Sequence, residues 1–341
     1  MAIKQMKLEN FTVFEALDVT FSEGINILIG ENGTGKTHIM KVLHSACQAT
    51  NSGVAFSDKI VKTMLPDDYK ISRLIRRKPG NSVAKVEVTA SLNQRTKRTI
   101  SAEFNTLTKK GGTVVIGEEA WERDLQELTS TFIPAKEILS NAYNLGAAVA
   151  KNNVRFDDTY IDILNSAKID VSVGRNSSEK DLKLKIVEKM TGGKVIYDPK
   201  VDEFYLKSGN SKQEFNLVAE GIRKMGLLWQ LIKNGALEKG TVLFWDEPEA
   251  NINPIHIPVI VELLLLLQRN GVQVFVATHD YILAKYFGVK KTDQDTICFH
   301  AFYKEENRVR HESKEKFADL KNNKITEAFN RLLDEIYDME E

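Results

Sequence analysis

Apolar residues form short, nearly continuous runs along the chain, which are typical of strands buried on both faces of a parallel sheet. Three such runs cover residues 25–29, 241–245 and 272–277. The first run is followed by a turn rich in glycine and then by a segment, 38–47, whose pattern predicts a helix. Strand, turn and helix in this order predict an α/β fold with a parallel core sheet.

A second pattern, strict alternation of apolar and polar residues, begins near residue 84 and predicts antiparallel strands. In chain order, the first part of the sequence predicts two strands before residue 42, a largely polar stretch at 52–80, strands at 84–92, 96–104 and 113–116, a helix at 121–128 and a strand at 131–134. The next part predicts polar helices over 140–190 with a break at 174–178, strands at 194–197 and 203–206, and a helix at about 217–233. The tail, 304–341, is highly charged and has apolar residues at helical spacing, which predicts an amphipathic helix that packs on its own domain or docks a partner. Those apolar residues are Ile325, Phe329, Leu332, Leu333 and Ile336.

The glycine-rich turn after the first run reads GENGTGKT at 30–37, which matches G-x-x-x-x-G-K-[ST]. Backbone N–H groups of such a turn and the positive end of the following helix converge on one point, where they favour phosphate. We expect Lys36 to reach the β- and γ-phosphates and the hydroxyl of Thr37 to hold Mg²⁺. The predicted nucleotide-binding residues are Glu31, Asn32, Gly33, Thr34, Gly35, Lys36, Thr37 and His38.

Polar side chains follow the other two apolar runs at the point where each strand ends. Asp246 and Glu247 come directly after the second run, and His279 follows the third. The carboxyl ends of parallel strands meet at one edge of a sheet, where α/β proteins bind ligands. We therefore expect Asp246 to bind Mg²⁺, Glu247 to polarise the attacking water and His279 to sense the γ-phosphate, so that Glu247, His279 and Lys36 form the catalytic set.

With these motifs the chain resembles an ATP-binding-cassette (ABC) ATPase head, of the branch that includes RecF, the SMC proteins and the ATPases of the overcoming-lysogenization-defect (OLD) and Septu type. The segments that carry the resemblance, from end to end of the chain, read MKLENFTVF at 6–14, GINILIGENG at 24–33, FIPAKE at 132–137 and DEPEANINP at 246–254. The resemblance implies a P-loop NTPase fold with a mixed or parallel core sheet, an antiparallel β arm and a helical second lobe. It also implies ATP and Mg²⁺ as cofactors.

The resemblance implies lobe boundaries as well, with residues 1–137 as the first lobe, 138–235 as the second, and 236–341 as the rest of the first lobe with the charged C-terminal helix. ABC heads place a signature segment on the γ-phosphate held by the opposite subunit. Here that segment reads LVAEGIRK at 217–224, without the usual serine, and Glu220, Gly221 and Asn251 are the residues expected to contact the nucleotide in trans. No glutamine stands at 134–137, so the metal-linked role of that position is vacant or taken by Glu137.

Composition excludes few functional classes, since 47 basic residues balance 47 acidic ones in 341 residues. The longest apolar stretch, near 257–267, is short and contains Glu262, and the N-terminus lacks a secretory apolar region, so we expect no membrane span and a cytoplasmic protein. The two cysteines, Cys47 and Cys298, stand in apolar contexts that suit reduced thiols.

Charge is distributed unevenly, because residues 70–110 hold eleven basic residues and two acidic ones. Such an excess attracts the phosphate backbone of nucleic acid or an acidic partner, although solvated strand faces with edge-protecting lysines would give the same pattern. The candidate DNA contacts in this segment are Arg76, Arg77, Lys78, Arg95, Lys97 and Arg98.

The resemblance implies a switch in which two heads form a homodimer around two ATP molecules, or a higher oligomer. The resemblance to the OLD and Septu ATPases further implies that the chain controls a DNA-related process, anti-phage defence. Because the chain shows no nuclease motif of its own, we expect the effector nuclease to be separately encoded. Two alternatives stay open: a RecF-like ATPase of DNA repair, and the ATPase subunit of an ABC transporter. The length leaves no room for the long heptad arms of SMC proteins.

Overall fold

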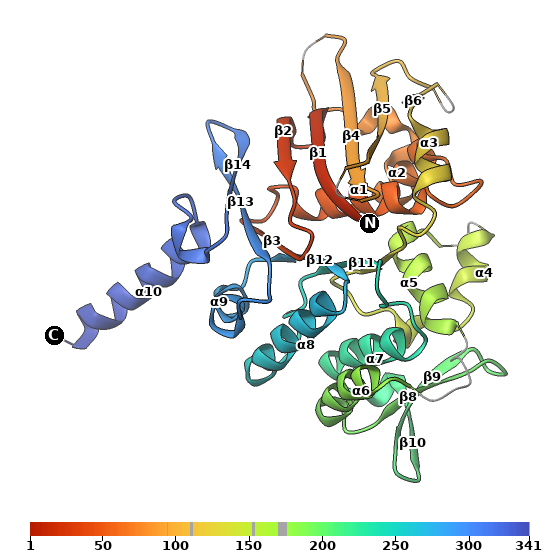
Figure 1. The fold of residues 1–341 in the computed structure, drawn as a ribbon, viewed down its shortest axis with the longest axis vertical. Helices are drawn as coiled ribbons and strands as arrows, with labels where there is room; N and C mark the ends of the chain where they lie inside the picture. Colours follow the sequence, from red (N-terminus) through yellow and green to blue (C-terminus); the bar gives the residue numbers. More distant parts are fainter. Residues whose placement is uncertain (79, 94, 110–111, 152–153, 170–175, 341) are drawn as a thin grey trace.

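The computed structural model describes residues 1–340 except 79, 94, 110–111, 152–153 and 170–175. Among these residues the strands form three sheets (Figure 1). The six-stranded core sheet has the order β14 (Arg308–Lys314), β13 (Ile297–Glu305), β3 (Ile25–Gly30), β12 (Gln273–Thr278), β11 (Val242–Asp246) and β7 (Ser130–Ile133). Its strands run parallel except β14, so the predicted mixed core sheet is confirmed.

The second sheet is the predicted antiparallel arm. Its order is β2 (Phe14–Thr20), β1 (Ala2–Phe11), β4 (Val83–Ser91), β5 (Lys97–Asn105) and β6 (Val114–Ile116). A smaller antiparallel sheet contains β10 (Ser211–Glu214), β9 (Glu203–Ser208) and β8 (Lys194–Asp198). The helices are α1 (Lys36–Gln48), α2 (Phe56–Met64), α3 (Glu118–Asp124), α4 (Leu145–Ala150), α5 (Asp158–Lys168), α6 (Ser178–Thr191), α7 (Glu220–Lys233), α8 (Ile257–Arg269), α9 (Tyr281–Lys290) and α10 (Lys324–Glu340).

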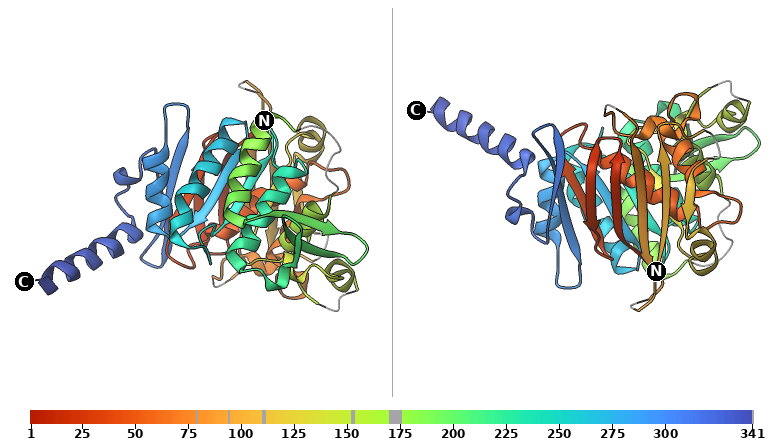
Figure 2. Two further views of the ribbon diagram at one scale, coloured as in Figure 1. Left: turned by 90° about the horizontal axis from the view of Figure 1, so that it is seen from below. Right: turned by 90° about the horizontal axis from the view of Figure 1, so that it is seen from above.

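The core sheet is buried on both faces, as its continuous apolar runs require. Ile25, Ile27 and Ile29 of β3 face a core shared with α7, α8 and α9, whereas Leu28 faces a core shared with α1 and the arm sheet. Figure 2 shows the arm sheet on one side of the molecule and helices on the other. The core sheet and α1 are therefore enclosed between two apolar layers.

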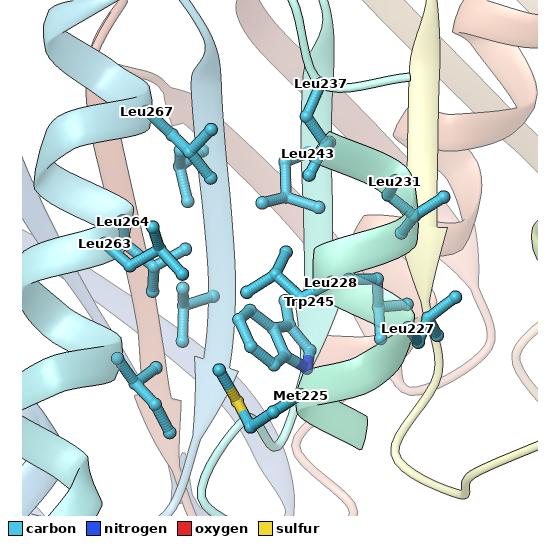
Figure 3. Packing of buried hydrophobic residues seen from close by; sticks show 14 of the residues in the cluster. Met225, Leu227, Leu228, Leu231, Leu237, Leu243, Trp245, Leu263, Leu264 and Leu267 are labelled. Atoms are coloured by element: carbon cyan, nitrogen blue, oxygen red, sulfur yellow. The ribbon is translucent and has the colours of Figure 1, made fainter. Parts of the chain in front are cut away.

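The larger of the two cores lies between the core sheet and α7 and α8, and Figure 3 shows part of it. Trp245 of β11 is fully buried there, in one cluster with Leu228 of α7 and Leu264 of α8. At about 25 cal/mol per Å² of buried apolar surface, side chains of this size stabilise a fold by about 2 kcal/mol each. The strand that ends at Asp246 is thus fixed by packing along its whole length.

Several predicted boundaries need correction. The segment before residue 42 contains three strands, because the chain turns back between β1 and β2 at Thr12, which has a positive φ of 48°. The polar stretch at 52–80 contains α2, whose buried face is only two or three residues wide. The predicted helix at 121–128 begins and ends earlier, as α3. Strand β10 was not predicted because all four of its residues are exposed and carry no alternation.

The charged tail holds two strands before its helix, because β13 reaches residue 305 and β14 follows at once. Helix α10 forms as predicted and extends away from the body (Figure 1). At its start Phe329 stacks on Tyr281 of α9, with ring centroids 4.1 Å apart, and Ile325 packs against the larger core. Farther along, Leu332 and Ile336 are exposed. Only the first half of the helix packs on its own domain.

The lobe boundaries after residues 137 and 235 lie outside helices and strands, between β7 and α4 and between α7 and β11. The division itself stays a prediction. In the described part of the chain, none of the helices combines the length and the apolar character that crossing a membrane requires.

Candidate functional site

Three strands of the core sheet bring the predicted site residues to one edge. β3 and β12 pair in parallel with Ile29 opposite Thr278, and β12 and β11 pair with Ala277 opposite Asp246. The turn after β3, the carboxylates after β11 and His279 after β12 consequently leave the sheet side by side. This is the juxtaposition that the order of apolar runs predicts.

The glycine-rich turn closes tightly onto the start of α1. Gly35 caps α1 with φ at 89°, and a side chain there would overlap the ring of Phe14. No acidic residue stands in the first turn of α1, so its free N–H groups and positive dipole end face the turn unopposed. The turn is therefore shaped and charged for an anion.

Lys36 lies folded over this turn. Its Nζ donates to the carbonyl oxygens of Gly30 at 2.7 Å and Glu31 at 3.1 Å. Burial is the main cause that lowers the pKa of Lys36, and the carboxylates of Asp246 and Glu247 oppose it. An ammonium held by carbonyl oxygens alone is available for a phosphate oxygen. A second cation, the Nζ of Lys304 on β13, lies beside Gly33 and was not predicted.

The turn and the end of β11 meet directly, because the Thr37 hydroxyl donates to Asp246 Oδ2 at 2.9 Å. Burial raises the pKa of Asp246 to about 6, against the effect of this hydrogen bond. A hydroxyl and a carboxylate side by side are hard oxygen ligands of the kind that Mg²⁺ prefers. The residues present therefore fit the metal that the motif implies.

Glu247 and His279 form a second pair at the same edge. His279 Nδ1 lies 3.3 Å from Glu247 Oε1, and both side chains are partly exposed, at 49% and 33%. Water can therefore reach the carboxylate. The backbone of Glu247 has a positive φ of 48°, an uncommon conformation for a residue with a side chain, and turns the chain sharply after Asp246.

Two residues of this region were not assigned a role from the sequence. Glu249 is partly buried and accepts a hydrogen bond from Thr278 Oγ1 at 2.6 Å, and burial raises its pKa. Lys224, in the signature-like helix α7, is buried and donates to the Glu247 carbonyl oxygen at 2.6 Å. The position of Glu249 in the DEPE motif, residues 246–249, could have identified it from the sequence. Nothing in the sequence marks Lys224, because a helical lysine is ordinarily exposed.

The residues predicted to contact a nucleotide in trans lie together on another surface. A side chain at Gly221 would overlap the Asn251 backbone oxygen, so α7 and the loop after β11 touch at this glycine. A hollow of about 250 Å³ beside them is lined by Gly221, Asn251 and His256 among others, and its described lining includes no residue of the glycine-rich turn. Leu217 and Ile255 are 70% and 73% exposed on the same segments.

Glu137, at the position of the missing glutamine, is held by α7. Its carboxylate lies 3.0 Å from Arg223 Nε and is 2% exposed, and it also accepts from the Ser140 N–H at 3.2 Å. The Glu137 carboxylate is thus already paired with two groups of the protein itself. The structure thus gives Glu137 a role in joining the segment after β7 to α7.

The six candidate DNA contacts fall into two separate groups. Arg76, Arg77 and Lys78 precede β4, near Asn10, whereas Arg95, Lys97 and Arg98 lie at the opposite end of β4 and β5. The strands between them span about 27 Å. The structure therefore does not unite them into one patch, and several are engaged: Arg98 with Asp124, Lys78 with Glu15, and Arg76 with the Val13 carbonyl oxygen.

The first group borders the glycine-rich turn. A cavity of about 510 Å³ is lined by Arg73, Arg76 and Arg77 on one side and by Thr12 and His38 on the other. His38 Nδ1 lies 3.1 Å from Thr12 Oγ1, and burial lowers its pKa to about 4. His38 is the third residue of α1 and follows Thr37 directly, so this cavity lies close to the glycine-rich turn. The sequence pattern did not reveal it, since its walls come from distant segments.

Comparison with known proteins agrees with this geometry. A family model described as "AAA domain, putative AbiEii toxin, Type IV TA system" matches residues 25–284. Among curated proteins, the DNA replication and repair protein RecF of Streptococcus gordonii is 30% identical over 90 residues, which are 26% of this chain and 25% of that protein. RecF of Lysinibacillus sphaericus is 32% identical over 81 residues, 24% of this chain and 21% of that protein. The chain thus spans about a quarter of the length of these relatives.

Solved structures resemble the chain over nearly its whole length. An SMC head bound to the C-winged helix domain of ScpA has a TM-score of 0.61 at 13% identity, covering 93% of this chain and 99% of that one. The SMC head domain from Thermotoga maritima has a TM-score of 0.53 at 15% identity, covering 93% and 100%. At such identities the likeness concerns the fold, and it confirms the predicted P-loop ATPase head.

Proposed function

We propose that this chain, which belongs to the AAA-domain family whose model matches residues 25–284, is a magnesium-dependent ATPase that works as a switch. The short similarities to RecF and the fold shared with SMC heads support this proposal. One observation carries the proposal. The Thr37 hydroxyl donates to Asp246 at 2.9 Å, at the edge where Lys36, Glu247 and His279 also lie.

Each of these residues has a distinct task in ATP hydrolysis. The turn at 30–37 and Lys36 bind the phosphates, and Thr37 and Asp246 would hold Mg²⁺. The metal, when bound, supplies positive charge that neutralises the phosphate oxygens. Glu247 accepts a proton from the attacking water, and His279, 3.3 Å away, orients that carboxylate and reports the γ-phosphate. The cavity between His38 and Arg76 accepts the nucleoside.

Dimerisation on ATP is part of the proposal. Its support is the surface formed by Glu220, Gly221 and Asn251, which opens to solvent beside the exposed apolar side chains of Leu217 and Ile255. In a head-to-tail dimer this surface would complete the site of the opposite copy, with backbone N–H groups at the start of α7 replacing the missing serine. Higher oligomers of such dimers are compatible with the same contact.

For the biological process we propose anti-phage defence with a separately encoded effector nuclease, and a direct or indirect link to DNA. The OLD-like and Septu-like sequence pattern and the family description, which names the AbiEii toxin, support this choice. RecF-like DNA repair is the second candidate, favoured by the short similarities to RecF chains. The transporter alternative has no such support among the relatives named above.

Two substitutions test the ATPase. Lys36→Ala removes a charge-assisted contact to phosphate and should weaken Mg-ATP binding by about 10- to 100-fold in calorimetry. Glu247→Gln should retain ATP binding, lower kcat by about 100-fold or more, and accumulate a dimer with ATP in size-exclusion chromatography. Glu119→Gln, an exposed carboxylate on α3, is the matched control and should behave as the unaltered chain.

The outcomes separate the parts of the proposal. No heat with Mg-ATP for the unaltered chain would contradict the nucleotide site itself. Binding with a monomer in the Glu247→Gln variant would contradict the dimer. Tight ATP-dependent binding to gapped DNA, without toxicity when the neighbouring gene is co-expressed, would favour DNA repair over defence.

A further inference from the structure

A buried ammonium on α7 holds the loop that carries Glu247. Lys224 is 3% exposed, and its Nζ donates to the Glu247 carbonyl oxygen at 2.6 Å and lies 3.4 Å from the Ala250 carbonyl oxygen. Within the described residues it forms no ion pair with a carboxylate at 4.0 Å or less. Burial lowers the pKa of Lys224, and the nearby carboxylates of Glu249 and Glu247 oppose that shift. A buried ammonium is costly to desolvate, so its presence against two backbone oxygens of this loop calls for a role there.

The loop needs such support because its backbone is strained. Glu247 has a φ of 48° and Asn251 a φ of 62°, both in the left-handed region that residues with side chains rarely adopt. The Glu247 N–H donates to the Ala277 carbonyl oxygen at 2.9 Å, which fixes one end of the residue to β12. The carbonyl group at its other end is the acceptor that Lys224 holds. The two contacts together determine the direction in which the Glu247 side chain leaves the backbone.

The same helix is held from a second side. Arg223, the neighbour of Lys224, pairs with buried Glu137 at 3.0 Å, and Gly221 one turn earlier touches the Asn251 backbone. The start of α7 is therefore joined to the segment after β7 and to the loop after β11. A displacement of this helix would move the Glu247 carbonyl group with it.

We propose that Lys224 is a positioning residue for hydrolysis, which holds the backbone of Glu247 so that its carboxylate faces His279 and links that carboxylate to the Gly221 surface of α7. The inference rests on the proposed ATPase activity. It goes further in assigning a role to a residue outside the phosphate-binding and carboxylate motifs. Because Lys224 lies on α7, contact of another molecule with the Gly221 surface is transmitted to the backbone of Glu247 through the hydrogen bonds of Lys224, beside the contact of Gly221 with Asn251.

The test compares Lys224→Met, which fills the space without a donor, with Lys224→Arg, which restores charge and donors. We expect Lys224→Met to lower kcat for ATP at least tenfold while the dissociation constant for Mg-ATP changes less than threefold, and Lys224→Arg to recover most of the rate. Lys233→Met, at the far end of α7 where Lys233 donates to Asn176 at 3.1 Å, is the matched control and should keep kcat within twofold. Thermal melting monitors folding in all variants.

A double substitution separates positioning from general loosening of the fold. If Lys224 acts through Glu247, then Lys224→Met should add no further loss to the residual rate of Glu247→Gln. A further tenfold loss in that background, an unchanged kcat in folded Lys224→Met, or a parallel fall in ATP affinity would each overturn the inference. Should Lys224→Met fail to fold, Lys224→Gln, which keeps one donor, replaces it in the same cycle. Absence of ATP hydrolysis by the unaltered chain would instead contradict the proposed function.

Discussion

At the residue scale, the distinctive feature of this molecule is a set of polar side chains that lose much of their contact with water. Lys36, Asp246 and Glu249 surround the candidate site, and each has its pKa moved by burial toward the uncharged form. Away from the site, His300 is fully buried between strands, with Nδ1 2.9 Å from Ser313 Oγ and Nε2 3.2 Å from Asn26 Oδ1.

The histidines of β13 and β14 should make stability depend on pH. Burial lowers the pKa of His300 to about 3 and that of His311, 3.3 Å away, to about 4, so both are neutral when folded. Below about pH 6.5 the unfolded chain gains protons that the folded chain does not, and each histidine lowers the free energy of unfolding by up to about 1.4 kcal/mol per pH unit. Urea unfolding at pH 7 and pH 5.5 measures this loss.

The variant His300→Asn isolates one histidine, because asparagine keeps hydrogen-bonding groups but does not titrate. Its loss of stability between pH 7 and 5.5 should be smaller than that of the unaltered chain. An equal loss in both proteins would show that His300 is not the titrating group.

At the scale of elements, helices connect the site to the rest of the molecule. α1 begins at the glycine-rich turn, and farther along it Lys41 pairs with Asp157 at 2.9 Å and His44 with Asp162 of α5 at 3.0 Å. Lys59 of α2 joins the same carboxylate at 2.7 Å. α7 is connected to the site through Lys224, which donates to the Glu247 carbonyl oxygen. α10 differs, because only its first half is attached.

Substitutions along α10 should therefore have unequal effects. Leu332→Gln with Ile336→Gln changes exposed positions to good helix formers, and we expect the free energy of unfolding to stay within about 0.5 kcal/mol. Phe329→Ala removes the stacking on Tyr281 and should cost about 1–2 kcal/mol. Urea midpoints of the two variants check this, and equal losses would mean that the second half of α10 also packs on the body.

At the scale of the whole molecule, the arm sheet separates two basic regions that adjoin in the sequence. One lines the cavity beside His38, and the other lies at the far ends of β4 and β5. The net charge of the whole chain, which is near zero, gives no indication of these two basic regions. The two basic regions are therefore separate sources of positive potential.

Charge reversal in each region should separate the two activities. Arg76→Glu with Arg77→Glu is expected to weaken Mg-ATP binding at least tenfold, because both residues line the cavity beside His38, close to the glycine-rich turn. Arg95→Glu with Lys97→Glu should leave ATP binding unchanged and reduce the salt dependence of DNA binding. Calorimetry with Mg-ATP and fluorescence anisotropy with duplex DNA at two salt concentrations give the comparison. Loss of Mg-ATP binding in the variant with Arg95→Glu and Lys97→Glu would show that the two basic regions do not act separately.

The sequence alone determined the core sheet and the chemistry at its edge. Continuous apolar runs before residues 30, 246 and 278 required parallel buried strands, and such strands end together, so the sequence placed Thr37, Asp246 and His279 in one site. Local patterns also predicted the antiparallel arm and α10. These features depend on residues close together in the chain, where periodicity and turn chemistry act directly.

Only the tertiary structure decided the contacts between distant segments. Burial of Lys224 against the Glu247 carbonyl group, pairing of Arg223 with Glu137, the cavity between His38 and Arg76, and the separation of the two basic groups all depend on how sheets and helices pack. The physical reason is that a side chain's charge and spacing are written in the sequence, whereas its burial and its partners are set by elements that the chain brings together from hundreds of residues away.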